Sequence, residues 1–281
     1  MRILVVLPDR LSYILASEPA VESIRNRYKS SEIIALSNER FSDIPARWDF
    51  VDDLAVYKDK ASFCSRFSLM LMLHRFRSDL VFFLGGAFPD FLHRILLTGK
   101  KIVPDYTFPT IRESHIDVFI SNDIDYIDRY PLWYFPPGFK YRIGRVKAPL
   151  LTLSPFSAGF PIERYLYIMA EYNRRFGGSV IITGNVDNYE KSMAFDHFDF
   201  VFNQVGKTNP DSLAFIYRHS TVCMISDRDS AVLCSSVNKD FLYIEETGKY
   251  NPFCFLENHW PMKDHEILEI LSEITESKNL C

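Results

Sequence analysis

The stretch that decides the fold is Gly206-Lys-Thr-Asn-Pro-Asp-Ser-Leu-Ala-Phe-Ile-Tyr-Arg-His-Ser-Thr-Val-Cys-Met-Ile-Ser-Asp227. Apolar residues recur at helical spacing over 211–219, which predicts a helix with Asn209 or Thr208 as its N-cap. The continuous apolar run over 221–226 predicts a strand that is buried on both faces. A loop, a helix and a buried strand in this order are typical of a parallel α/β sheet.

The same alternation extends along the rest of the chain. Short apolar runs rich in β-branched residues predict further strands at 3–7, 32–37, 79–86, 101–103, 150–154, 179–184, 198–202 and 241–245. Helical spacing predicts helices at 63–76, 91–97, 162–176 and 265–274. One more helix is expected after the first strand, opened by Pro19 in its first turn. Repeated βαβ alternation predicts an α/β fold with doubly wound, Rossmann-like sheets.

The alternation breaks once, over residues 131–147. This segment contains residues that interrupt helices and strands, namely Pro131, Pro136, Pro137 and Gly138. We therefore expect two Rossmann-like domains, 1–147 and 148–281, facing a central cleft where a ligand binds at the carboxyl ends of the strands. The aromatic run 133–135 is expected to pack at this joint, with a platform for a lipid or sugar as the alternative.

Composition excludes several classes of protein. No run approaches the roughly 20 apolar residues of a membrane-spanning helix, and the first strand follows Met1 with no secretion signal before it. The five cysteines are scattered and the seven histidines dispersed, so neither a disulfide framework nor a metal site is expected. Basic runs are too short for a nucleic-acid binder. These features predict a reduced, cytoplasmic protein.

Charge differs between the two halves of the chain. Up to Lys147 the net charge is +3, and over the remainder it is −7, which together give the overall −4. An excess of cations suits an acidic acceptor on the first half. Ordinary scatter of surface charge is the alternative.

Four groups of segments occur in a defined order along the chain. They are Met-Arg-Ile-Leu-Val-Val at 1–6 with Glu18-Pro19-Ala20-Val21, 79–86 with Arg94 and 99–100, 151–159 with 161–165, and 206–227. This ordered set resembles the bacterial heptosyltransferases of glycosyltransferase family nine, which have the GT-B fold. The resemblance covers essentially the whole chain, and the last segment is its most specific part.

The resemblance implies a function. Members of that family transfer a heptose from ADP-heptose to the phosphorylated inner core of lipopolysaccharide, with inversion at the sugar and without a metal. The implied partners are therefore a nucleotide-sugar donor and a lipid-linked or surface glycan acceptor, and the implied cofactor is none. The family works at the inner face of the cytoplasmic membrane, although no basic amphipathic helix in this sequence requires peripheral contact there.

Donor-side residues follow from the matched motifs. The resemblance assigns donor binding to Ser154, Ser157, Thr183, Gly184, Lys207, Thr208 and Arg228. Asp227 matches the aspartate that faces the donor sugar and is the first catalytic candidate. The family's phosphate-binding lysine after Gly159 is missing here, and its later glycine and histidine are replaced by Asp229 and Val232. Arg228 either replaces the missing cation or forms a solvated pair with Asp229.

The acceptor side departs further from the family. Where the family has Gly-Asp, with the aspartate as base, this chain aligns Ser12-Tyr13. Asp9, four residues earlier, is the second catalytic candidate, with an ordinary loop carboxylate as the alternative. Arg10, Ser12 and Tyr13 complete the acceptor-side set. Tyr13 is a weak base because the pKa of a phenol is about 10.

Two hypotheses therefore stay open. The chain is either an active glycosyltransferase with an altered donor or acceptor, or a catalytically degenerate relative that binds a nucleotide, a glycan or a partner protein. Binding of a nucleotide diphosphate distinguishes the two, because the first hypothesis requires it.

Overall fold

A computed structural model describes residues 1–58, 63–85, 99–104, 111–156, 161–237, 240–244 and 263–279. The chain forms two compact units, of which the first runs from Met1 to Pro136 and the second begins at Pro137. Residues 137–147, which the sequence pattern places in the first domain, lie in the second unit. Tyr141, Ile143 and Val146 pack there against Leu150, Ile181 and Ile216.

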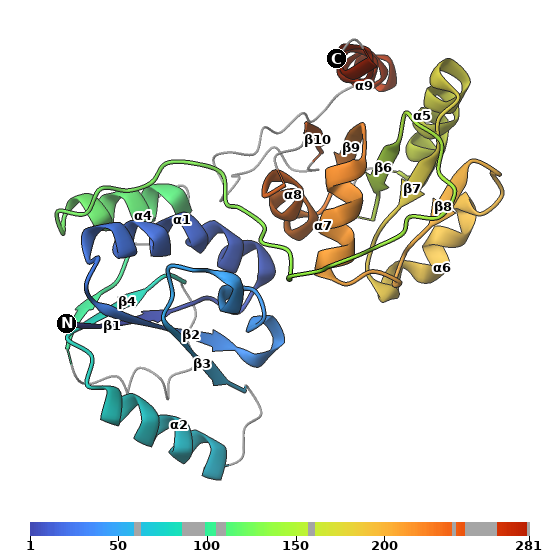
Figure 1. Ribbon diagram of the computed structural model, residues 1–281. Coiled ribbons are helices and arrows are strands. Elements are labelled where there is room, and N and C mark those ends of the chain that lie inside the picture. Colours follow the sequence, from blue (N-terminus) through green and yellow to red (C-terminus); the bar gives the residue numbers. More distant parts are fainter. Residues whose placement is uncertain are drawn as a thin grey trace. The chain divides into compact units, whose positions relative to one another are not determined.

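The first unit contains a parallel sheet in the order β3-β2-β1-β4-β5 (Figure 1). Its strands are β1 (Arg2–Val6), β2 (Glu32–Asn38), β3 (Asp53–Tyr57), β4 (Leu80–Phe83) and β5 (Lys100–Ile102). The central strand β1 pairs with β2 and β4, so that Ile3 lies between Ile33 and Leu80. Because the strand order reverses beside β1, the carboxyl ends of β1 and β4 form the switch point where such sheets bind ligands.

Helices cover both faces of this sheet. They are α1 (Leu11–Arg27), α2 (Phe63–Phe76) and α4 (Ile111–Ile120), with the short 3₁₀ turns η1 (Glu39–Phe41) and η2 (Pro45–Arg47) after β2. Figure 1 shows α1 and α4 together on one face and α2 on the other. Leu69, Leu73 and Phe76 of α2 pack on the sheet, and Phe119 of α4 meets Phe82 with ring centroids 5.9 Å apart on the opposite face.

The predicted start of the first helix at Pro19 is wrong, because α1 begins at Leu11 and holds Pro19 in its interior. A proline there removes one helical hydrogen bond and costs about 3 kcal/mol. Burial of Ile14, Leu15 and Val21 on the sheet offsets that cost.

A buried ion pair fixes the end of the first unit to α1. Both guanidinium Nη atoms of Arg129 donate to the carboxylate of Glu18 at 2.7 Å, and Glu18 is fully buried. The backbone N–H of Leu132 and the hydroxyl of Tyr134 donate to the same carboxylate, at 3.2 and 3.1 Å. Burial raises the pKa of Glu18, and the hydrogen bonds from Arg129 oppose that rise. This carboxylate organises the segment 129–134.

The aromatic run 133–135 packs within the first unit where the structure prints its contacts. Trp133 is buried, and the guanidinium of Arg47 lies 5.6 Å from its ring centroid. Tyr134 meets Phe50 edge to face. These contacts support the predicted packing role.

The second unit repeats the architecture with the strand order β10-β9-β6-β7-β8. Its strands are β6 (Leu151–Ser154), β7 (Val180–Ile182), β8 (Val201–Asn203), β9 (Val222–Ile225) and β10 (Phe241–Tyr243). All pairings are parallel, and β6 lies between β7 and β9. The switch point of this sheet therefore lies at the carboxyl ends of β6 and β9.

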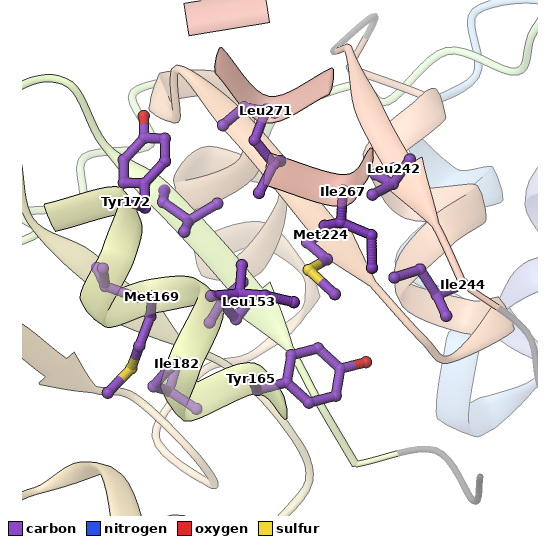
Figure 2. Packing of buried hydrophobic residues seen from close by; sticks show 14 of the residues in the cluster. Leu153, Tyr165, Met169, Tyr172, Ile182, Met224, Leu242, Ile244, Ile267 and Leu271 are labelled. Carbon is purple, nitrogen blue, oxygen red and sulfur yellow. The ribbon is translucent and has the colours of Figure 1, made fainter. Parts of the chain in front are cut away.

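The helical elements of the second unit enclose its core. They are α5 (Ile162–Phe176), η3 (Val186–Asn188), α6 (Tyr189–Ser192), η4 (Met193–Phe195), α7 (Pro210–His219), α8 (Arg228–Ser235) and α9 (Asp264–Asn279). Figure 2 shows how α5 and α9 cover one face of the sheet, with side chains that include Tyr165, Met169, Tyr172, Ile267 and Leu271 over Leu153 and Met224.

Two local expectations are revised in the second unit. The strand predicted at 198–202 is β8 at Val201–Asn203, because Phe198 and Phe200 instead pack against the core with ring centroids 5.4 Å apart. The N-cap of α7 is Asn209, whose Oδ1 accepts from the Ser212 N–H at 2.8 Å, so Thr208 does not cap this helix. The predicted helix 91–97 lies outside the described residues.

Candidate functional site

The carboxyl ends of β6 and β9 meet in a polar seam. The hydroxyl of Ser154 donates to Oδ2 of Asp227 at 2.6 Å, across 73 residues of sequence. The hydroxyl of Ser226 donates to the carbonyl of Ser154, also at 2.6 Å. The two strand ends that flank the switch point are thus joined by side chains, and two predicted site residues, Ser154 and Asp227, are in direct contact.

Asp227 has a second role in the fold. It is the N-cap of α8, and its Oδ1 accepts from the backbone N–H of Ser230 at 2.8 Å. Burial raises the pKa of Asp227, while the hydrogen bonds from Ser154 and Ser230 lower it. A carboxylate therefore already accepts from an N–H at the first turn of α8, where an anionic ligand would otherwise bind.

Arg228 and Asp229 lie in the first turn of α8, and both are exposed. The family pattern suggests a loop here, but the Asp-x-x-Ser spacing of residues 227–230 starts a helix. The sequence analysis missed Ser226 and Ser230, which hold the seam together. The spacing of Asp227 and Ser230 was the available signal.

Thr183 and Gly184 follow β7 at the same edge of the sheet. The hydroxyl of Thr183 is buried, and it donates to the carbonyl of Leu153 at 3.2 Å and lies 3.4 Å from the hydroxyl of Tyr217. A Cβ added at Gly184 would lie 2.6 Å from the ring of Phe156. The glycine is therefore required by the close approach of Phe156, independently of any ligand.

The loop after β8 completes the edge. The N–H of Gly206 donates to the carbonyl of Gly184 at 2.9 Å, which joins the loops after β7 and β8. Lys207 is exposed, and its Nζ donates to the carbonyl of Asn203 at 3.0 Å. Thr208 follows in the same loop. Ser157 lies outside the described residues.

The predicted donor-side residues that the structure describes therefore share one edge of one sheet. In spatial order they follow β9, β6, β7 and β8, and they are Asp227 and Arg228, Ser154, Thr183 and Gly184, and Lys207 and Thr208. This edge offers hydroxyls, one carboxyl group and the cationic side chains of Lys207 and Arg228.

The predicted acceptor-side residues lie at the switch point of the first sheet. Asp9 and Arg10 are exposed between β1 and α1. Ser12 and Tyr13 lie in the first turn of α1, where Ser12 is buried, so the acceptor loop is shorter than the family pattern suggests. The helix begins directly after Arg10, and Asp9 therefore stands close to its amino terminus.

One further side chain near this switch point was not singled out from the sequence. His115 of α4 is fully buried, and neither ring nitrogen makes a well-formed hydrogen bond with the described residues. Burial lowers the pKa of His115 to about 4, against an opposing interaction with the Leu84 backbone just after β4. The imidazole is therefore neutral at neutral pH. A lone histidine in an apolar helix gives no sequence signal for this role.

Metal sites and membrane spans were also sought in the parts of the chain that the structure describes. There, no three side chains of His, Cys, Asp or Glu are grouped as a metal ion requires. No helix in those ranges is both long enough and apolar enough to cross a bilayer.

Two doubly wound parallel sheets on one chain define a protein of the GT-B type, as the sequence predicts. The chain shares its fold with E. coli ADP-heptose lipopolysaccharide heptosyltransferase II, at a TM-score of 0.76 and 13% identity, covering 99% of this chain and 100% of that one. A glycosyl transferase of family 9 from Veillonella parvula matches with a TM-score of 0.79 and 12% identity, over 98% and 97% of the two chains.

E. coli heptosyltransferase WaaC, solved with ADP-2-deoxy-2-fluoro heptose, matches with a TM-score of 0.72 and 13% identity, over 97% of this chain and 99% of that one. At this level of identity the likeness establishes the fold. No protein-family model and no curated protein sequence matches the chain.

Proposed function

We propose that the chain is a glycosyltransferase that moves a heptose or related sugar from a nucleotide diphosphate donor to a lipopolysaccharide-core or other cell-surface glycan. The observation that carries the proposal is a fold shared over nearly the full length of both chains with heptosyltransferases, one of them solved with an ADP-sugar analogue. The residues at the carboxyl edge of the second sheet support it, because ligands of such sheets bind at that edge.

The donor edge suggests how the diphosphate would be held. Lys207 and Arg228 are exposed cationic side chains that can stabilise the charge of a departing diphosphate. A raised pKa shifts Asp227 toward its neutral form, which weakens its repulsion of phosphate oxygens. No metal enters this proposal.

Asp9 is the proposed general base on the acceptor side. Sugar transfer with inversion needs a group that takes the proton of the acceptor hydroxyl. Asp9 is exposed at the first switch point, where a substrate can reach its carboxylate. Replacing Asp9 with Asn keeps its shape and removes its basicity.

The test is a turnover assay with ADP-heptose and other nucleotide sugars, read as release of the nucleoside diphosphate in the presence of a truncated lipopolysaccharide core. The proposal expects release that depends on the acceptor and falls about 100-fold or more in Asp9→Asn. Nucleotide binding without turnover with any donor would favour the catalytically degenerate relative. Absence of nucleotide binding would contradict both the enzyme and its nucleotide-binding alternative.

A further inference from the structure

Helix α2 of the first unit is apolar on two opposite faces. Its sequence is Phe-Cys-Ser-Arg-Phe-Ser-Leu-Met-Leu-Met-Leu-His-Arg-Phe over 63–76. Leu69, Leu73 and Phe76 form the face that packs on the sheet. A surface helix of a globular protein normally carries charged and polar residues on the opposite side. On α2 the opposite side instead continues the apolar character.

The outer face of α2 exposes large apolar side chains. Phe67 and Leu71, one helical turn apart, are 46% and 39% exposed, and the neighbouring Met72 is 42% exposed. Three such side chains within six residues form a contiguous patch on one helix. Patches of this kind mark interaction surfaces, whereas single exposed apolar residues are ordinary.

The charge around the patch has one sign. From Lys60 to Ser78 the chain contains Lys60, Arg66, Arg75 and Arg77 and no acidic residue. Arg75 and Arg77 are exposed at the carboxyl end of α2, beside the exposed His74. By contrast, the chain as a whole carries an excess of acidic residues and a net charge of −4. An apolar patch flanked only by cations is complementary to an anionic surface that also accepts apolar groups.

We propose that the outer face of α2 docks on the surface of an anionic lipid bilayer. Phe67, Leu71 and Met72 would enter the boundary between headgroups and acyl chains, and Arg75 and Arg77 would contact lipid phosphates. Stable binding to a bilayer requires apolar burial together with charge attraction, and this helix offers both. A protein partner or a second copy of this chain would bury the same apolar side chains, but neither accounts for a flank free of acidic residues over 19 positions.

The experiment is co-sedimentation of the full chain with vesicles. One set contains phosphatidylcholine with about 30% phosphatidylglycerol, and the other contains phosphatidylcholine alone. The proposal expects binding to the anionic vesicles, at least about tenfold weaker binding to the neutral ones, and loss of binding at high salt. This result does not depend on sugar transfer, so the docking surface and the proposed enzyme activity can fail separately.

A pair of double variants tests the surface itself. Phe67→Ser with Leu71→Ser should weaken binding to anionic vesicles about tenfold or more. The matched control is Tyr189→Ser with Met193→Ser, also four residues apart and 48% and 55% exposed on the second unit, and it should change binding less than twofold. Thermal melting followed by circular dichroism should show both double variants folded, because all four side chains are exposed.

Three outcomes would overturn the proposal. Equal binding to anionic and neutral vesicles, or none to either, would remove the role of charge. Equal binding by the α2 variant and the wild-type chain would place the contact elsewhere. A wild-type dimer in light scattering that the α2 variant converts to a monomer, with no vesicle binding, would assign the patch to a second copy of the chain.

Discussion

Arg129→Met tests the energetics of the first unit most sharply. The substitution removes two hydrogen bonds of 2.7 Å from a carboxylate that is fully buried. Removing one partner of a buried ion pair typically costs 3–5 kcal/mol. Glu18 keeps the N–H of Leu132 and the hydroxyl of Tyr134, and the Arg129 side chain is partly exposed. We therefore expect a loss at the lower end, about 3 kcal/mol.

The assay is urea unfolding followed by tryptophan fluorescence. Trp48 and Trp133 both lie in the first unit and report its unfolding. Arg27→Met is the matched control, because the partner of Arg27 is Asp123, whose side chain is 88% exposed, and such pairs contribute less than about 1 kcal/mol. If Arg129→Met destabilises the unit no more than Arg27→Met does, the buried pair is not what holds segment 129–134.

Three further predictions concern other sites. His115 binds a proton in the unfolded chain at a pKa near 6.5 and in the folded chain only near 4, so stability should fall by up to about 3 kcal/mol as pH drops through that window, and less in His115→Phe. Gly178→Ala should cost about 3 kcal/mol or more in urea unfolding, since its Cβ would lie 1.7 Å from the Pro149 carbonyl oxygen, whereas Gly177→Ala should cost about 1 kcal/mol. Asp227→Ala should cost about 1–2 kcal/mol through the lost cap, a loss that the sequence alone does not predict, and Asp227→Asn should restore most of it; equal stability of the two variants would contradict the capping role.

The sequence predicts much of the fold because hydrophobic periodicity survives in it. Helices α2 and α5 have the predicted bounds, since their apolar spacing is regular and strand signals flank them. Helix α1 begins earlier than predicted, because tertiary burial overrides the local signal of Pro19. The edge strand β3 gave no clear pattern, because Asp53 and Val56 are exposed and only Ala55 and Tyr57 are buried.

The candidate site was predictable in position but not in its contacts. The rule that ligands bind at the carboxyl ends of parallel strands places the donor-side residues on one edge, as the structure does. The bond between Ser154 and Asp227 requires β6 and β9 to be neighbours, and two strands separate them in the sequence. The close approach of Phe156 to Gly184 likewise depends on packing, which spacing does not encode.

The outer face of α2 was not predicted for a related reason. Periodicity identifies a helix by contrast between an apolar and a polar side, and α2 has little contrast. Only the exposure of Phe67 and Leu71 in the folded unit separates a core-facing side from a second, unpartnered side.

Amide hydrogen exchange with and without ADP tests the central claim most directly, because it reports where a nucleotide binds. The account predicts slower exchange in the loops after β6, β7, β8 and β9, around residues 154–156, 183–186, 206–208 and 226–230. Unchanged exchange at saturating ADP, or protection confined to the first unit, would contradict it.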